Sequence, residues 1–425
     1  MTTQLYSAQT VLARDNFCLD YKHTSLPLIH AIVLVKKAAA MTYDTLGVGK
    51  DGVYKTIVEA CDYVLAGNAD EMFVVDALQG GAGTSTNMNV NEVIANVALR
   101  ILGQPLNNFD HIHPLDDVNR GQSTNDVYPT ALRIASINLL RKLSDECALL
   151  QTALQSRENE FDDVKKIGRT ELMDAVPVTL GMEFGAYAQA IARDRWRLYK
   201  VEERLRQVNI GGTAVGLADN ADRKYRYSVI ETLRGLTGIG LAVAEYPMDI
   251  TQNYDVFVEV SGLIKALAVN LMKISNDLRL MNSGPYGGLS EITLQSRQMG
   301  STIMPGKVNP VIPEMIMQVA IRVMSNDFAI TTAAAHGEFE LNAFAPLIAD
   351  AVLESLTLLT NAVPIFRTKC IETLTANKAN CQTKLENSLT FATAYVPKLG
   401  YDKVVQIIKE NDGDVKKIKD ALEKL

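Results

Sequence analysis

Several features that would assign this chain to a common class of function are scarce or missing. It has no lysine- or arginine-rich block, its formal net charge is -7 and aromatic residues make up 6% of it, so nucleic-acid binding is not expected. The sequence has no uninterrupted apolar run of about twenty residues, the length that crosses a membrane, and it does not begin with a basic segment followed by an apolar one. We therefore predict a cytoplasmic protein with neither nucleic-acid nor membrane partners.

Signatures of bound cofactors are missing as well. The five cysteines lie far apart and form no CxxC pair, which fits reduced thiols and predicts no metal site. The Gly81-Ala82-Gly83 segment lacks the third glycine of a dinucleotide fingerprint, and no Walker-type Gly-Lys-Ser/Thr sequence occurs. His111 and His113 stand two residues apart without further ligands beside them, which favours hydrogen-bonded structural histidines. We expect no cofactor and no metal.

Helical periodicity, by contrast, is abundant. Hydrophobic residues make up 47% of the chain and recur at three- and four-residue spacing between charged residues, as in amphipathic helices. In residues 261–280 they form a single stripe, which predicts a core or subunit contact. The longest segments with this pattern are 25–41, 127–160, 178–207, 261–280, 312–335 and 345–361. Helices of this length predict a mainly α protein built around a helix bundle.

Polar or glycine-rich breaks separate the predicted helices. Loops that a rigid scaffold holds in place commonly carry function, so chemistry is expected in these breaks. They lie at residues 79–87, 111–126, 167–175 and 282–310.

Residues 300–310, in the last break, read GSTIMPGKVNP. The glycines permit a tight or mobile backbone and the prolines exclude regular helix, so the segment is a shaped loop. Ser301, Lys307 and Asn309 bring a hydroxyl, an ammonium and an amide, a set suited to binding a carboxylate. Taken alone, an ordinary surface loop is the favoured interpretation.

Two other breaks are rich in short hydrogen-bond donors: residues 83–87 read GTSTN and residues 122–126 read QSTND. Each is also explained as a helix N-cap, because Ser, Thr and Asn are common there. A helix start would still favour a bound carboxylate through its free N–H groups and its dipole. Three such loops together indicate one anion-binding pocket.

These residues together resemble a known family. The 300–310 sequence is similar to the Gly-Ser-Ser-x-Met-Pro-x-Lys-x-Asn-Pro signature of the aspartase/fumarase superfamily, an eleven-residue pattern of high specificity. The resemblance extends over nearly the whole chain. Further similar segments are residues 26–40, 80–92, 113–130, 168–170, 283–292 and 338–342.

The resemblance implies an all-α fold in which long central helices form the twenty-helix core of a homotetramer. Each active site would be built by three subunits and would take a small dicarboxylate. We accordingly expect an N-terminal domain at 1–120, a central helical domain at 121–368 and a small C-terminal domain at 369–425.

The resemblance also implies roles for individual residues. Ser301 would be the base that removes a proton from the carbon next to one substrate carboxylate. Because a serine hydroxyl is a weak base, backbone N–H groups and a positive charge such as that of Lys307 must stabilise its oxyanion. Lys307 and Asn309 would hold the substrate's carboxylates. The remaining residues of the implied anion cage are Thr84, Ser123, Thr124, Asn125 and Thr170.

The sequence indicates the leaving group of the reaction less clearly than it indicates the base. Residues 81–85, 123–126 and 311–314 resemble aspartases more than fumarases, whereas residues 336–342 resemble fumarases at least as well. We predict an aspartate ammonia-lyase, which releases ammonia from L-aspartate to give fumarate. The alternatives are a fumarate hydratase, a lyase that adds another small amine to fumarate, and a non-catalytic relative that keeps the scaffold.

Glu171 is the most informative departure from the family pattern, in which His or Gln usually follows Gly-Arg-Thr. The family places this side chain near the glutamate that matches Glu314, so two carboxylates would share the site. We hypothesise that Glu171 and Glu314 bind or protonate the leaving amine; the alternative is that Glu171 turns outward. Two further departures are Tyr286, which replaces an arginine, and Leu115, which replaces a polar residue.

Overall fold

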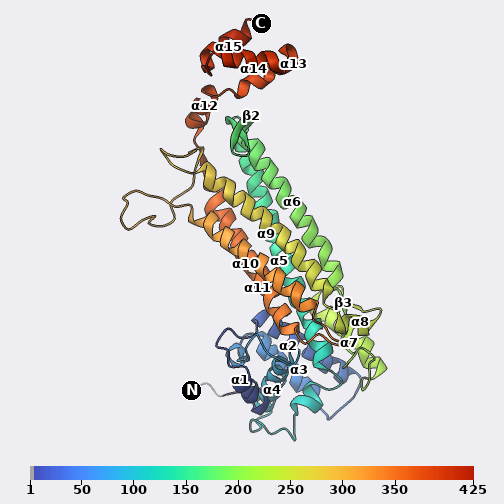
Figure 1. The fold of residues 1–425 in the computed structure, drawn as a ribbon. Helices are drawn as coiled ribbons and strands as arrows, with labels where there is room; N and C mark the ends of the chain where they lie inside the picture. The colour runs from blue at the N-terminus through green and yellow to red at the C-terminus, as the bar shows by residue number, and fades with distance from the viewer. Residues whose placement is uncertain (1–3) are drawn as a thin grey trace. The chain divides into compact units, whose positions relative to one another are not determined.

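The structure is a computed structural model that describes residues 4–425, and helices dominate it (Figure 1). The helices are α1 (Ala8–Asn16), α2 (Leu26–Thr45), α3 (Val53–Leu65), α4 (Thr84–Ile101), α5 (Thr124–Glu160), α6 (Leu180–Leu205), α7 (Arg223–Thr237), α8 (Pro247–Gln252), α9 (Asp255–Met281), α10 (Val311–Ala334), α11 (Ala345–Phe366), α12 (Lys378–Glu386), α13 (Val396–Leu399), α14 (Tyr401–Glu410) and α15 (Val415–Glu423). The strands are β1 (Lys165–Thr170), β2 (Met173–Thr179), β3 (Gln207–Val208), β4 (Ala242–Val243), β5 (Ile292–Thr293) and β6 (Thr375–Ala376).

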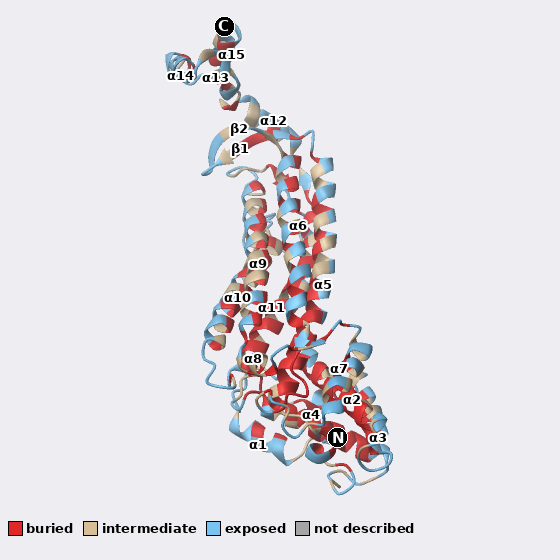
Figure 2. Cartoon of the chain, turned by 90° about the vertical axis from the view of Figure 1, so that its right-hand side faces the viewer, coloured by how far each residue is buried: buried red, intermediate tan, exposed pale blue. Residues whose placement is uncertain are grey.

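The mainly α fold and its six long helices are confirmed. On α9 the predicted stripe is buried at Ile264, Leu267, Leu271, Ile274 and Leu278. Figure 2 shows buried and exposed residues on different faces of this helix, as amphipathic periodicity requires.

The break at 167–175 folds into a hairpin that the sequence analysis did not predict. Strands β1 and β2 pair antiparallel, with Thr170 opposite Met173. The two residues between them, Glu171 and Leu172, have φ values of 54° and 64°. Two-residue hairpins favour turns with positive φ at both positions, but such turns usually contain glycine or asparagine. Because neither is present here, the familiar sequence signal of a hairpin is missing.

Contacts divide the chain into two compact units. Unit 1 is the described part of Met1–Ser144 together with Trp196–Ala266 and Ile321–Thr360. Unit 2 is Asp145–Arg195, Leu267–Ala320 and Asn361–Leu425. Each unit therefore combines three separate stretches of chain, and long helices such as α5 contribute to both. The division into segments 1–120, 121–368 and 369–425 stays a prediction.

In unit 1, helix α2 packs against α3, α4 and α7. Pro27 lies in its first turn, where the missing N–H costs no helical hydrogen bond.

Helices α2 and α11, the latter with the turn that follows it to Ile371, are long and apolar enough to cross a membrane. The most apolar windows of these helices are, however, 67% and 56% buried inside the structure. Such burial is typical of core helices in a folded protein.

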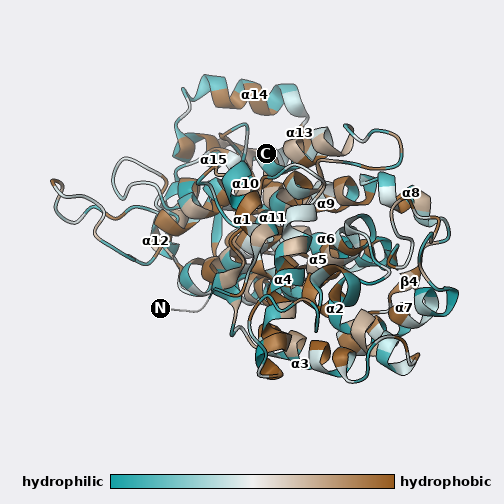
Figure 3. Ribbon diagram, turned by 90° about the horizontal axis from the view of Figure 1, so that it is seen from below, coloured by the Kyte–Doolittle hydropathy of each residue, from teal (hydrophilic) through white to brown (hydrophobic). Residues whose placement is uncertain are grey.

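In unit 2, the last three helices form a small cluster of their own. Val404, Ile407, Ile418 and Leu422 pack with Ala392 in its core. Figure 3 shows hydrophobic and hydrophilic residues alternating along α14. Most of residues 401–423 is therefore helical, in α14 and α15.

Glu92, on α4, fixes the start of α1 within unit 1. Its carboxylate is 2% exposed and accepts hydrogen bonds from the backbone N–H groups of Ser7, Gln9 and Thr10 at 2.8, 2.9 and 3.2 Å. The Thr10 hydroxyl donates a fourth bond at 2.6 Å. A negative charge at this end of a helix also stabilises the helix dipole.

We predict that Glu92→Ala lowers the free energy of unfolding by about 2–4 kcal/mol, because it leaves several buried donors without an acceptor. Urea unfolding followed by circular dichroism measures the change. Glu59→Ala, at an exposed position on α3, is the control, with an expected change within about 0.5 kcal/mol. Equal effects of the two substitutions would refute this role of Glu92.

Candidate active site

The two donor-rich loops of unit 1 both lead into helix starts. Thr84 is the first residue of α4, and its hydroxyl donates to the Gly81 carbonyl oxygen at 2.8 Å. Ser123 directly precedes α5; its Oγ accepts from the Asn125 N–H at 3.2 Å, and its own N–H donates to the Asp126 carboxylate at 3.0 Å. Ser123 therefore caps α5, as one interpretation of the sequence proposed, whereas the N-cap of α4 is Gly83 and Thr84 is the first helical residue. The starts of two long helices favour an anion through their free N–H groups and dipoles.

A close packing contact joins these two helix starts. Gly83 has a φ of 93°, and a Cβ atom built on it would lie 2.4 Å from the buried ring of Tyr128, on α5. Only glycine satisfies both the backbone angle and this approach. The start of α4 therefore packs against the second turn of α5, close to the Ser123–Asn125 segment. That these loops form one anion-binding pocket stays a prediction.

Asp126 holds the start of α5 in place through hydrogen bonds to backbone N–H groups. It is fully buried, and its carboxylate also accepts from the N–H groups of Gly211 and Thr213 at 3.0 and 2.9 Å. Burial raises the pKa of Asp126 to about 6, although the three N–H donors oppose this shift. Nearby, the Asn125 side chain donates to the Ala214 carbonyl at 2.8 Å, so the 211–214 segment supports the same helix start.

Thr170 and Glu171 lie at the tip of the β1–β2 hairpin in unit 2. Both are exposed, as are Leu172 and Met173 beside them. Positive φ values at the two non-glycine turn residues cost on the order of 1 kcal/mol each, and backbone strain of this kind is concentrated at functional sites. The hairpin presents the Glu171 carboxylate at an exposed turn.

Ser301 lies in the long loop between α9 and α10 in unit 2 (Figure 1). Its Oγ accepts hydrogen bonds from the backbone N–H groups of Ile303 and Met304, at 3.2 and 3.0 Å. Two N–H donors directed at one hydroxyl oxygen favour its ionised form, because they stabilise a negative charge there. This is the kind of support that a serine base requires.

The same loop closes on itself at a narrow neck. The Asn309 side chain donates to the Gly300 carbonyl at 2.7 Å. A Cβ atom at Gly300 would come within 2.0 Å of the Lys307 carbonyl oxygen, so glycine is required there. Ser301, Lys307 and Asn309 are thereby brought together. One of the two hydrogens of the Asn309 side-chain amide is thus used in a hydrogen bond within the loop. This bond was not predicted from the sequence.

The base of this loop is anchored while its tip is exposed. The Arg297 side chain donates to the Lys369 carbonyl at 2.9 and 2.7 Å, and Leu294 N–H donates to the Asn282 side chain at 2.8 Å. At the tip, Ile303 is 82% exposed. The loop is thus supported at its base and open to solvent at its tip.

Glu314 lies in the first turn of α10, also in unit 2, and is partly exposed. The guanidinium of Arg279, at the end of α9, lies 3.9 Å from its carboxylate. Arg279 was not predicted as a site residue. No sequence signal marked it, because the contact joins two helix ends that are far apart along the chain.

Glu291 is the centre of a buried ionic network that the sequence analysis also missed. Its side chain is 1% exposed and lies 2.8 Å from Lys166 Nζ and 2.7 Å from Arg169 Nη1. Lys166, itself buried, also pairs with Glu183 at 2.7 Å. Burial raises the pKa of Glu183, although Lys166 opposes the shift. The network ties β1, which ends at Thr170, to the loop segment that leads to Ser301.

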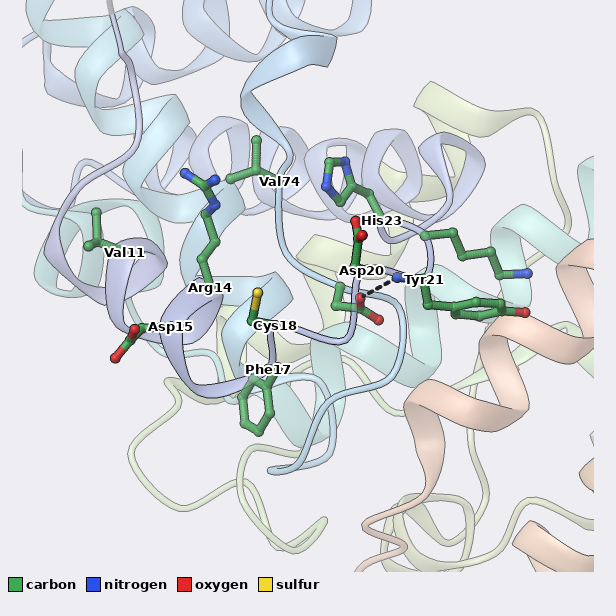
Figure 4. Close-up of a pocket in the computed structure, with 11 residues that line it drawn as sticks. Val11, Arg14, Asp15, Phe17, Cys18, Asp20, Tyr21, His23 and Val74 are labelled. Atoms are coloured by element: carbon green, nitrogen blue, oxygen red, sulfur yellow. Dashed lines mark hydrogen bonds between the residues drawn. The ribbon is translucent and has the colours of Figure 1, made fainter.

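A large pocket of unit 1, about 620 Å³ in volume, lies elsewhere (Figure 4). Its lining carries charges of both signs, including those of Arg14, Asp15, Asp20, Lys22 and Asp76. Lys22 is already paired with acidic side chains, at 2.8 and 3.2 Å. None of the predicted site residues lines this pocket, and its mixed charges do not form a dicarboxylate site.

Comparison with known proteins identifies the family of the chain. Residues 1–325 match the family described as Lyase. The chain therefore belongs to this lyase family, the aspartase/fumarase superfamily.

The chain is also similar to individual proteins of known name and to solved structures. An aspartate ammonia-lyase of Bacillus sp is 43% identical over 95% of this chain and 86% of its own length. Among solved structures, a fumarate lyase:delta crystallin from Brucella melitensis is 43% identical, with a TM-score of 0.94 over 99% of this chain and 93% of its own. A class II fumarase from Schistosoma mansoni is 32% identical, with a TM-score of 0.94 over 100% and 93%.

We predict that Glu291→Ala lowers the free energy of unfolding by about 3–5 kcal/mol, because two buried cations lose their shared partner. Urea unfolding followed by circular dichroism measures the loss. The matched control is Glu372→Ala, which breaks a more exposed pair with Arg367 and should cost less than about 1 kcal/mol. A loss for Glu291→Ala no greater than that of the control would contradict this role.

Proposed function

We propose that the protein is an aspartate ammonia-lyase, which converts L-aspartate reversibly to fumarate and ammonia. The observation that carries the proposal is the Ser301 loop, in which two backbone N–H groups support the hydroxyl oxygen and Lys307 and Asn309 lie at the neck. The 43% identity to an aspartate ammonia-lyase over most of the chain supports the choice of ammonia over water, since the fumarase is only 32% identical.

The proposed reaction begins with removal of a weakly acidic proton from a carbon atom of aspartate. Ser301, as an alkoxide, removes the proton from the carbon next to the side-chain carboxylate of aspartate. The electron pair spreads onto that carboxylate as an enediolate, which nearby donors stabilise. The carbon–nitrogen bond then breaks, the double bond of fumarate forms and the substrate's ammonium group leaves as ammonia. The proton held by Ser301 passes to the released ammonia, which gives ammonium and restores the alkoxide. The anion cage proposed for the carboxylates consists of Thr84, Ser123, Thr124, Asn125, Thr170, Lys307 and Asn309.

We further propose that the active form is a cytoplasmic homotetramer with active sites shared between subunits. Large apolar side chains exposed on the long helices support this association. Phe328 and Ile321 on α10 are 75% and 51% exposed, and Trp196 and Tyr199 on α6 are 63% and 67% exposed. Apolar surface of this kind commonly marks a protein interface.

The activity itself is tested by supplying fumarate with ammonia, with water alone and with a panel of small amines. Loss of the ultraviolet absorbance of fumarate reports the reaction. The proposal expects loss with ammonia and the appearance of aspartate. Loss in water alone would favour fumarate hydratase, and loss only with another amine would reassign the leaving group. No reaction in any mixture would overturn the proposal.

We predict that Ser301→Ala lowers kcat for aspartate by about 10²–10⁴-fold, the usual range for loss of a general base. Thr302→Ala, which removes the next hydroxyl along the loop, is the control and should retain kcat within about threefold. Initial rates of fumarate formation measure both effects. If the two variants kept equal activity, Ser301 would not be the base.

We also propose that Glu171 and Glu314 recognise the leaving amine. Glu171→Gln keeps the size of the side chain but removes its charge, so the KM for ammonia in the addition direction should rise by about tenfold, the effect of one lost charged hydrogen bond. The KM for fumarate should change little. Steady-state rates at varied ammonia and amine concentrations provide the measurement, and unchanged kinetics with every amine would eliminate this role.

A further inference from the structure

Lys36 on α2 is a lysine in an apolar environment that no step of the proposed reaction uses. Its side chain is fully buried, as are Val33, Val35 and Ala38 around it on the same helix. Burying an ammonium group costs several kcal/mol unless polar partners compensate. The partners of Lys36 therefore indicate what this buried amine does.

Those partners are two amide oxygens in the turn directly before α5. Lys36 Nζ donates to Asn119 Oδ1 at 2.6 Å and to Gln122 Oε1 at 3.0 Å. Gln122 is followed immediately by Ser123, the first residue of the proposed cage segment. The Lys36 amine thus holds the turn that delivers Ser123, Thr124 and Asn125.

Asn119 extends the connection to the other helix start. Its Oδ1 also accepts from Asn87 Nδ2 at 3.1 Å and from Asn91 Nδ2 at 3.3 Å, both on α4, which begins at Thr84. Its own Nδ2 donates to the Gln122 carbonyl at 3.1 Å. A single amide oxygen with three donors, one of them the lysine amine, therefore lies between α2, α4 and the turn before α5.

From this arrangement we infer that Lys36 is a positioning residue for substrate binding: its amine fixes the 119–122 turn, and thereby the relative placement of the Thr84 and Ser123 helix starts. The inference rests on the proposed function only for the identity of the dicarboxylate. Lys36 acts through Asn119 and Gln122 and makes no contact with the reacting atoms. Its loss should weaken carboxylate binding more than the chemical step.

Electrostatics support the same role. Burial lowers the pKa of Lys36 to about 7, although the Asp126 carboxylate on α5 and Cys61 on α3 oppose the shift. The amine is therefore easily converted between its charged and neutral forms near neutral pH. A carboxylate bound at the adjacent helix starts would favour the charged form, which is the stronger hydrogen-bond donor to the two amide oxygens.

The test compares Lys36→Met, which keeps length but removes the amine, with Lys37→Met. Lys37 is the next residue on α2 and pairs with Asp62 instead. In the full-length protein, calorimetry measures the binding of succinate, a dicarboxylate that cannot react, and steady-state kinetics measure aspartate turnover. Lys36→Met should raise the Kd for succinate and the KM for aspartate about tenfold and change kcat less than threefold, whereas Lys37→Met should leave all three unchanged.

Gln122→Met, at a half-buried position, provides a second test if Lys36→Met folds poorly. It removes one of the two acceptors and should raise the succinate Kd in the same direction. In the double variant, Gln122→Met should raise the succinate Kd by a smaller factor than it does alone. The reason is that both substitutions remove the same hydrogen bond between Lys36 and Gln122. Unchanged succinate binding in both single variants would overturn the inference, as would wild-type protein that binds no succinate. Wild-type protein that binds succinate but does not deaminate aspartate would overturn only the proposed function.

Discussion

The buried carboxylate of Glu291 is the interaction on which much of unit 2 depends. It meets Lys166 and Arg169 at 2.8 and 2.7 Å in a region where a lone charge would be strongly unfavourable. The backbone of the same residue bonds to Met281, at the end of α9, and to Asn377, just before α12. One residue thus fixes the hairpin, the base of the loop that contains Ser301 and the entry to the C-terminal helices.

In unit 1, buried polar groups also support the segments that carry proposed site residues, but the groups are of a different kind. Here a buried lysine, not a carboxylate, lies at the centre, and amides surround it. Most residues proposed to touch substrate are partly or largely exposed, Thr124 being buried, whereas the charged residue at the centre of each network, Lys36 or Glu291, is buried. This arrangement suits a site for a small dicarboxylate, because the binding groups must reach the ligand while their positions stay fixed.

The long helices were predictable because each repeats an apolar stripe that only a helix can place on one face. The loop containing Ser301 was predictable from its glycines, prolines and specific motif. The β1–β2 hairpin was not, since its turn residues, Glu171 and Leu172, are not those that such turns prefer. The buried partners of Glu291 and Lys36 were also missed, although a lysine inside the apolar run of α2 was a signal of burial.

The sequence by itself determined the helical class, the family and the residue types available for carboxylate chemistry, because periodicity and motifs are local properties of the chain. Only the tertiary structure decided how the loops are supported. It brought Gly83 against Tyr128, directed two N–H groups at Ser301 and placed Glu291 between two cations. These are contacts between side chains or backbone groups whose geometry depends on packing, and most of them join residues that are distant in sequence, so no local pattern encodes them.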